Sequence, residues 1–184
     1  ARVEQGDRVA VIGAGGGVGS YAIQIAKAVG AEVTAVCGPT KVDGIRRLGI
    51  ENVIDHTRQD LSPEPRDRFD VVIDTAGKTP LRQLRQALTG GGRLVIVGAD
   101  HGHRITGGLG RWLLALAWSP FVGQTLRPFA ARPVDRVDLD HLRGLMDDGT
   151  LVPVVDRTFS LAETADAMRY LDHRTAPGKV VITV

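Results

Sequence analysis

The glycine-rich segment from Gly13 to Gly19 is the strongest chemical signal in the sequence. Five of its seven residues are glycine, and it lies between a strand-like apolar run at Arg8–Ile12 and a stretch with helical spacing. Glycine permits a sharp strand-to-helix turn, close approach of the backbone to a pyrophosphate, and close packing of the helix on the strand. Free N–H groups at the helix start would then hold the pyrophosphate. Ala14 stands where the usual fingerprint has its first glycine, so a glycine-rich loop without a dinucleotide remains the alternative. The predicted pyrophosphate-binding residues are Gly15, Gly16, Gly17, Val18 and Gly19.

The residues after the second predicted strand indicate which dinucleotide would bind. A site for NAD places Asp or Glu there, where the carboxylate accepts hydrogen bonds from the ribose and repels a 2′-phosphate. Here the strand ends at Cys37-Gly38, Thr40 and Lys41 follow, and the first carboxylate is Asp43, within the next predicted helix. A hydroxyl donor and an ammonium charge suit a phosphate, so the sequence favours NADPH as the cofactor, with NADH possible. His56, after the third strand, is a candidate donor near the adenosine, although a surface role explains a single histidine as well.

Strands and helices alternate along most of the chain, joined by short connections. This pattern predicts a doubly wound α/β domain, a parallel Rossmann sheet of order 3-2-1-4-5-6 with helices on both faces. The predicted strands are Arg8–Ile12, Glu32–Val36, Asn52–Ile54, Phe69–Asp74, Arg93–Val97 and an edge strand at Thr125–Phe129. The predicted helices present Val18, Ala22, Ile25, Ala26 and Val29 on one face, then Val42–Leu48, then Leu81, Leu84 and Leu88, then Leu109–Trp118. Loops are expected at Ser62–Pro65 and at His101–Gly110.

The last part of the chain has a different organisation. A helical face at Leu139, Leu142, Leu145 and Met146 is followed by a predicted strand at Val152–Phe159. Ser160 and Glu163 have the spacing of a capping box for a further helix, and a final strand is expected at Lys179–Val184. We therefore predict an NADP(H)-binding Rossmann domain over residues 1–150 and a C-terminal strand-helix-strand appendage over residues 151–184.

Several motifs together resemble the medium-chain dehydrogenase/reductase superfamily, and most closely its zinc-independent, quinone oxidoreductase-like branch. The resemblance covers nearly the whole chain and is more specific than the glycines alone. The motifs are the glycine turn with Ala22–Ala31, Arg47–Gly49 with Val53–Asp55, Asp70–Asp74, Gly92–Gly98 and Gly178–Val184.

The resemblance implies further site residues and a partner. In the family, the loops after the fourth and fifth strands touch the cofactor, which implies Ala76, Gly77, Val97 and Gly98 as cofactor-binding residues here. Family members are typically dimers joined through an edge strand, which corresponds to Gln124–Phe129, so a homodimer is expected.

One departure from the family affects the expected activity. Family enzymes begin with a substrate-binding domain that this chain lacks, and residues 151–184 would complete that absent domain. The sequence also begins at Ala1 without Met, so we expect a piece or subunit of a larger enzyme. No catalytic acid or base is named, because the family draws its substrate groups from the absent part.

Composition excludes several other classes of protein. The formal net charge is +2 and no basic run is present, so nucleic acid is not an expected partner. The single cysteine, Cys37, excludes a disulfide framework and a cysteine-based zinc site. We expect its side chain to be a small buried apolar group. No apolar stretch is long enough to span a membrane and no signal peptide is visible, so a cytoplasmic protein with no membrane contact is expected.

Other chemistry is weaker in the sequence. Asp100, His101 and His103 offer too few ligands for a metal site, and none is predicted. Tyr21 and Lys27 lack the four-residue spacing of a short-chain dehydrogenase. A methyltransferase is disfavoured because no acid follows the second strand.

The function that we expect is the cofactor-binding part of an NADPH-dependent oxidoreductase. Its small-molecule substrate would be a quinone, enone or carbonyl compound that receives a hydride. The alternative is a non-catalytic NADPH-sensing or interaction module, in which the C-terminal appendage would be covered by a second chain.

Overall fold

The computed structural model describes residues 1–59, 61, 68–98, 109–129, 135–172 and 178–184. The predicted loop at Ser62–Pro65 lies outside these residues, as does the segment from Ala99 to Gly108, which includes Asp100, His101 and His103.

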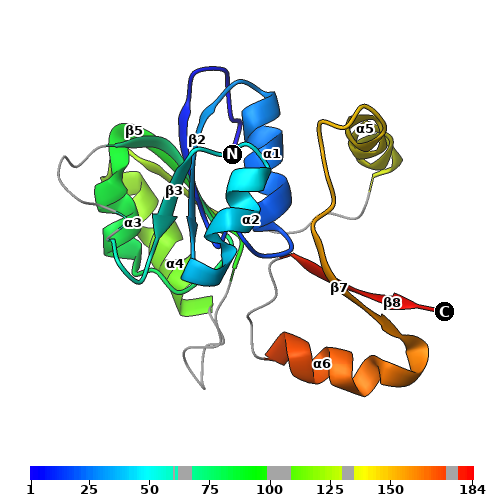
Figure 1. Ribbon diagram of the computed structural model, residues 1–184. Helices are drawn as coiled ribbons and strands as arrows, with labels where there is room; N and C mark the ends of the chain where they lie inside the picture. Colours follow the sequence, from blue (N-terminus) through cyan, green and yellow to red (C-terminus); the bar gives the residue numbers. More distant parts are fainter. Residues whose placement is uncertain (60, 62–67, 99–108, 130–134, 173–177) are drawn as a thin grey trace.

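A six-stranded parallel sheet forms the centre of the molecule (Figure 1). Its strands run in the order β3-β2-β1-β4-β5-β6, as the sequence predicts, and every neighbouring pair is parallel. The order reverses between β1 and β4, which makes this the switch point where ligands bind in such sheets. The strands are β1 (Arg8–Ile12), β2 (Glu32–Cys37), β3 (Asn52–Asp55), β4 (Phe69–Asp74), β5 (Leu88–Ile96) and β6 (Thr125–Pro128).

Helices cover both faces of this sheet, and each face has its own apolar core. One core includes Ile23 and Ile45, which come from the first two helices. The other includes Leu84 and Ala115, which come from the next two. The first pair is α1 (Gly19–Ala28) and α2 (Val42–Arg47), with a 3₁₀ turn η1 (Pro39–Lys41) before α2. The second pair is α3 (Leu81–Ala87) and α4 (Leu109–Trp118), with a 3₁₀ turn η2 (Ser119–Phe121) after α4.

The structure corrects two details of the predicted helices. The buried face of α1 carries Ile23 and Ala26, whereas Val18 and Val29 are exposed. The prediction was wrong because it assigned apolar residues to the core by type, while α1 turns its small and amide residues, Ser20 and Gln24 among them, inward. Leu88, predicted on the α3 face, instead begins β5 and is fully buried there, because α3 ends at Ala87.

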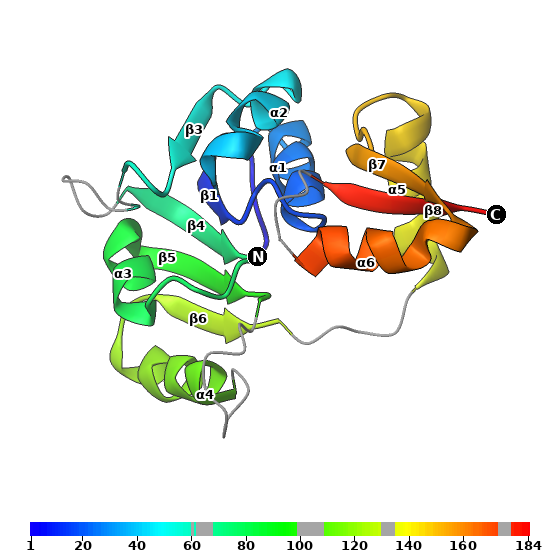
Figure 2. The same ribbon diagram turned by 60° about the horizontal axis from the view of Figure 1, so that its bottom comes forward.

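The C-terminal part forms a separate two-stranded parallel ribbon beside α1 (Figure 2). It consists of β7 (Val155–Ser160), a 3₁₀ turn η3 (Leu161–Glu163), α6 (Thr164–Asp172) and β8 (Lys179–Thr183). The predicted capping box is present, because the Glu163 carboxylate accepts a hydrogen bond from the Ser160 backbone N–H at 2.9 Å. Helix α5 (Arg136–Asp147) precedes this ribbon and lies beside it, away from the six-stranded sheet, in both views.

Candidate functional site

The turn between β1 and α1 is fixed to the end of β2 by backbone hydrogen bonds. The N–H groups of Gly13 and Ala14 both donate to Val36 O, at 2.9 and 3.1 Å. Gly13 has a φ of +81°, which favours glycine, and the Gly16 N–H donates to Gly13 O at 3.0 Å. The turn therefore has one defined conformation, set by β2.

Gly19 brings α1 into close contact with this turn. A Cβ atom at Gly19 would lie 2.2 Å from Gly13 O, closer than any side chain tolerates. The first residue of the helix therefore packs directly against the backbone of the turn. This is the close helix packing that the sequence pattern predicts for the last glycine of the fingerprint.

The start of α1 presents backbone N–H groups without a side-chain partner. Val18 occupies the N-cap position in a helical conformation, no side chain caps the helix, and its first turn contains no acidic residue. Within the ranges that the structure describes, the N–H groups of Gly17 and Val18 donate to no backbone carbonyl. Unpaired N–H groups at the positive end of a helix dipole attract an anion.

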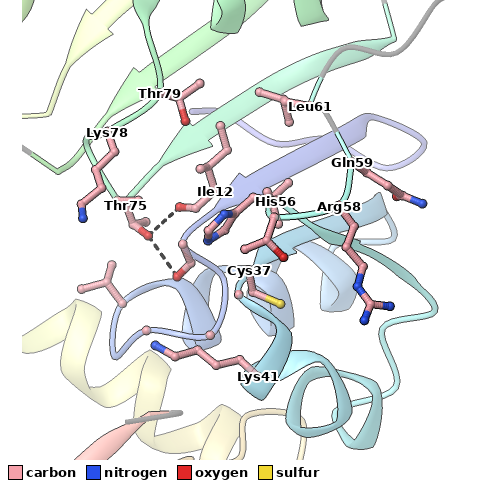
Figure 3. Close-up of a pocket in the computed structure, with 18 of the residues that line it drawn as sticks. Ile12, Cys37, Lys41, His56, Arg58, Gln59, Leu61, Thr75, Lys78 and Thr79 are labelled. Carbon is pink, nitrogen blue, oxygen red and sulfur yellow. Dashed lines mark hydrogen bonds between the residues drawn. The ribbon is translucent and has the colours of Figure 1, made fainter. Parts of the chain in front are cut away.

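A groove of about 870 Å³ opens along the carboxyl ends of the strands, above this turn (Figure 3). It is large enough for a substantial part of a nucleotide. Residues from the turn, the end of β2 and the loops after β3 and β4 line it. They are Ile12, Gly13, Gly15–Val18, Val36–Gly38, Lys41, His56–Gln59, Leu61, Thr75, Ala76, Lys78, Thr79 and Gln83.

Most of the predicted cofactor-binding residues meet in this groove. The lining includes seven of them, namely Gly15, Gly16, Gly17, Val18, Lys41, His56 and Ala76. The others do not line it. They are Gly19, which packs against the turn, Thr40, which is exposed in η1, and Gly77, Val97 and Gly98, which lie in the loops after β4 and β5.

Lys41 reaches from η1 to the glycine turn. The position of a Cβ on Gly15 would be 2.5 Å from Lys41 Cδ, so the aliphatic part of the lysine lies directly over Gly15. Burial lowers the pKa of the Lys41 ammonium, while the Cys37 thiol and the Asp156 carboxylate act in the opposite direction. A partly desolvated ammonium beside the positive end of a helix favours a bound anion.

None of the described residues that line the groove is a carboxylate. Cys37 and Gly38 lie at the end of β2, and His56 lies opposite, with its Nε2 3.7 Å from a Cβ position on Gly38. Burial raises the pKa of the Cys37 thiol to about 11, so the residue is a neutral apolar wall rather than a nucleophile. Asp43 does not line the groove and instead lines a neighbouring hollow with Pro39 and Arg46.

The loop after β4 is held in place at the switch point of the sheet. Thr75 Oγ1 donates to Ile12 O at 2.7 Å, which ties the end of β4 to the end of β1. The buried Asp74 carboxylate accepts hydrogen bonds from the N–H groups of Ala76 and Gly77, at 3.2 and 3.0 Å. The loop that the resemblance assigns to the cofactor is therefore held rigidly beside the groove.

Lys179 is a site residue that the sequence reasoning missed. It begins β8, and its Nζ lies 2.7 Å from a Cβ position on Gly17, at the start of α1. Of the four lysines in the chain, Lys41 and Lys179 lie beside the turn, and Lys41 and Lys78 line the groove. Two sequence signals could have drawn attention to Lys179: its place in the Gly178–Val184 motif, and the scarcity of lysine against nineteen arginines.

In the described ranges, no three His, Cys, Asp or Glu side chains gather into a group that could hold a metal ion. The described residues therefore provide no ligand set for zinc. None of the helices described here is long and apolar enough to cross a membrane.

Comparison with known sequences gives one family and several relatives. Residues 48–182 match the family described as "Zinc-binding dehydrogenase". The mitochondrial NAD(P)H oxidoreductase RTN4IP1 of Mus musculus is 31% identical over 98% of this chain and 48% of its own length. The trans-enoyl reductase pgmF of Aspergillus terreus is 33% identical over 97% of this chain and 52% of its own. The chain thus spans about half the length of these relatives.

Solved structures show the same fold. The quinone oxidoreductase of Coxiella burnetii has a TM-score of 0.81 and 26% identity, covering 100% of this chain and 55% of that protein. An NAD-dependent alcohol dehydrogenase has a TM-score of 0.81 and 30% identity, covering 99% and 52%. The sheet order, the glycine turn and these similarities agree, and the chain belongs to the zinc-binding dehydrogenase family of the medium-chain dehydrogenase/reductase superfamily.

Proposed function

We propose that the groove at the glycine turn binds NADPH. The single observation that carries this proposal is the uncapped start of α1, which opens on the groove between two lysines. A helix N-terminus with cations on both sides is electrostatically unfavourable unless an anion is bound there. At the end of β2, the described lining residues Val36, Cys37, Gly38 and Lys41 include no carboxylate, which favours a phosphorylated ribose over a free one.

Each part of the groove has a distinct role in this proposal. The N–H groups from Gly15 to Val18 bind the pyrophosphate. Lys41, with Thr40 beside it, binds the 2′-phosphate, and His56 lies along the adenosine. The ribose and nicotinamide lie next to Ala76, Gly77, Val97 and Gly98, at the ends of β4 and β5.

The names of the relatives support a reductase reaction for the whole protein. They include an NAD(P)H oxidoreductase, a trans-enoyl reductase and a quinone oxidoreductase. We propose that the whole protein reduces a quinone, enone or carbonyl compound with a hydride that the nicotinamide supplies. The residues of this chain bind and orient the cofactor, so the chain by itself binds NADPH without turning over substrate.

A homodimer is proposed on the free edge of the sheet. Strand β6 is an edge strand, and its neighbour α4 exposes Leu113 and Leu116. Phe121 and Phe129, which flank β6, are exposed as well. An unpaired strand edge beside exposed apolar side chains favours pairing with a second copy. Sedimentation equilibrium should show a dimer that Phe121→Asp weakens, and a monomer at all concentrations would contradict the proposal.

Calorimetric titration with NADPH and NADH tests the cofactor. NADPH is expected to bind more tightly, and Lys41→Ala should remove most of that preference, about tenfold, because a charge-assisted hydrogen bond to phosphate is lost. Lys27→Ala is the matched control: it removes the same charge from a lysine that donates to Gly49 O at 2.8 Å, and Lys27 does not line the groove. Equal affinity of the unmodified chain for both nucleotides would refute the roles of Thr40 and Lys41.

A different measurement separates the proposal from its alternative, a non-catalytic sensing module. Both predict NADPH binding, so the discriminating measurement is reduction of a quinone or an enone by the whole protein. Turnover supports the reductase. Binding without turnover, together with a second chain that covers the β7–β8 ribbon, would support the module.

A further inference from the structure

Gln24 is a buried amide side chain that joins α1 to the C-terminal part of the chain. Its side chain accepts a hydrogen bond from Val152 N–H at 2.7 Å and donates one to Val152 O at 3.1 Å. The same amide nitrogen also donates to Ser20 O, one turn back in α1, at 2.8 Å. Only 5% of Gln24 is exposed. Both polar ends of the amide are therefore used, and the amide holds the backbone of one residue from both sides.

Val152 lies where the chain enters the β7–β8 ribbon. Two residues later, Val154 O accepts a hydrogen bond from the Lys179 N–H at 2.8 Å. The Lys179 side chain then reaches back to Gly17, at the start of the helix that carries Gln24. Figure 2 shows β8 starting beside α1. The contacts thus form a closed path from Gln24 through Val152, Val154 and Lys179 to Gly17.

The described part of the β7–β8 ribbon buries few apolar side chains. Among the described residues after position 150, only Leu151 and Ala167 are buried apolar residues. Apolar packing therefore contributes little to the placement of Lys179. The two hydrogen bonds between the buried Gln24 amide and Val152, by contrast, define both the distance and the direction of Val152 from α1.

We propose that Gln24 is a positioning residue for cofactor binding: by holding Val152 it sets the β7–β8 ribbon against α1, so that Lys179 lies over the N–H groups that bind the pyrophosphate. This inference rests on the proposed nucleotide site. The pyrophosphate is common to NADPH and NADH, so loss of the Gln24 contacts lowers the affinity for both by the same factor. Lys41 governs the ratio between the two nucleotides, and that ratio is unchanged.

A double-mutant cycle between Gln24 and Lys179 tests this proposal by calorimetric titration with NADPH and NADH. Gln24→Met keeps the side-chain volume and removes the hydrogen bonds. We expect Gln24→Met and Lys179→Met each to lower both affinities by about threefold to tenfold. The double variant should bind no more weakly than Lys179→Met alone, because Gln24 acts through Lys179.

Gln124 provides a matched control for Gln24, because its side-chain amide also donates and accepts hydrogen bonds with a distant residue. Gln124 donates to Arg85 O at 2.8 Å and accepts from Arg85 Nε at 3.1 Å, and it does not line the groove. Gln124→Met should lower the stability of the fold and leave both nucleotide affinities unchanged. A purely structural role of Gln24 would make the two variants alike in binding.

Hydrogen exchange provides a readout without nucleotide. The Val152 amide should exchange faster in Gln24→Met, while Gln24→Glu, which keeps an acceptor for the Val152 N–H, should restore part of the protection. If Gln24→Met does not fold, the same cycle is measured with Gln24→Glu.

Three results would overturn the inference. They are additive losses in the double variant, a changed ratio of NADPH to NADH affinity in Gln24→Met, and unchanged affinity in a variant whose Val152 amide is deprotected. Failure of the unmodified chain to bind either nucleotide would refute the proposed site itself, and the positioning role with it.

Discussion

The six-stranded sheet and the β7–β8 ribbon are held in place by different means. Side chains such as Val9, Val71 and Leu94 are fully buried in the sheet, between helices on both faces. In the ribbon and its helix, Leu161 is 61% exposed and Met168 57% exposed. The sheet therefore has the apolar burial of an independent domain, whereas the ribbon is placed against α1 mainly by polar contacts. Its exposed apolar side chains mark a surface suited to cover by another domain or chain.

The two regions should differ most in the free energy of unfolding that is lost when an apolar side chain is truncated. Leu94→Ala should lower the free energy of unfolding by about 2–5 kcal/mol, because it leaves a cavity in a fully packed core. Met168→Ala should lower it by less than about 0.5 kcal/mol, because the side chain is mostly in water already. Urea unfolding of both variants measures the difference. Similar losses would mean that the ribbon is packed as tightly as the sheet.

Two glycine substitutions should give a smaller difference in stability, between the start of α1 at the sheet and α5 beside the ribbon. Gly19→Ala should cost about 1–3 kcal/mol of stability, since the new methyl group would meet Gly13 O. Gly144→Ala, inside α5, has nothing within 4 Å and should stabilise the protein by about 0.5–1 kcal/mol through helix propensity. Thermal melts of the two variants should move in opposite directions. A stable Gly19→Ala that still binds nucleotide would contradict the packing assigned to the turn.

The smallest expected effect is on the pH dependence of stability. A hydrogen bond from Arg8 lowers the pKa of Asp70 in the sheet, and hydrogen bonds from Ser160 lower the pKa of Glu163 in the ribbon. A lowered pKa in the folded state stabilises the protein above the unfolded pKa, and that contribution is lost as the pH falls through the folded pKa.

Asp70→Asn and Glu163→Gln test this sign. Each variant should lose stability near neutral pH and lose less than the unmodified protein on acidification to about pH 3. Urea midpoints at the two pH values measure the change. Urea midpoints of Glu163→Gln that equal those of the unmodified protein at both pH values would contradict the contribution assigned to Glu163.

The fold could be predicted because the sheet follows from local patterns. Arg8–Ile12 and Phe69–Asp74 are nearly continuous apolar runs, as buried parallel strands are, and the glycine turn marks the start of the first helix. The buried face of α1 was mistaken because Gln24 is polar yet buried. Its two hydrogen bonds to Val152, 128 residues away, leave no trace in local periodicity.

The candidate site was predictable only where it lies close to the glycine turn in sequence. Lys41 follows the second strand, where we propose that the ribose binds, so its position could be inferred from its place in the chain. Lys179 reaches Gly17 through a tertiary contact between the two ends of the chain, which no spacing rule encodes. Thr40 was predicted from its hydroxyl and from the same place after the second strand, but its exposed position in η1, off the groove lining, depends on the local direction of that 3₁₀ turn.

The most direct test of the nucleotide site is to follow backbone amide resonances by nuclear magnetic resonance while NADPH is added. The amides of Gly15, Gly17 and Val18 should show the largest shifts, followed by those of Lys41 and His56, and the resonances of α5 should not move. Shifts confined to α5 or β6, or none at the start of α1 at saturating nucleotide, would contradict binding of a pyrophosphate at the glycine turn.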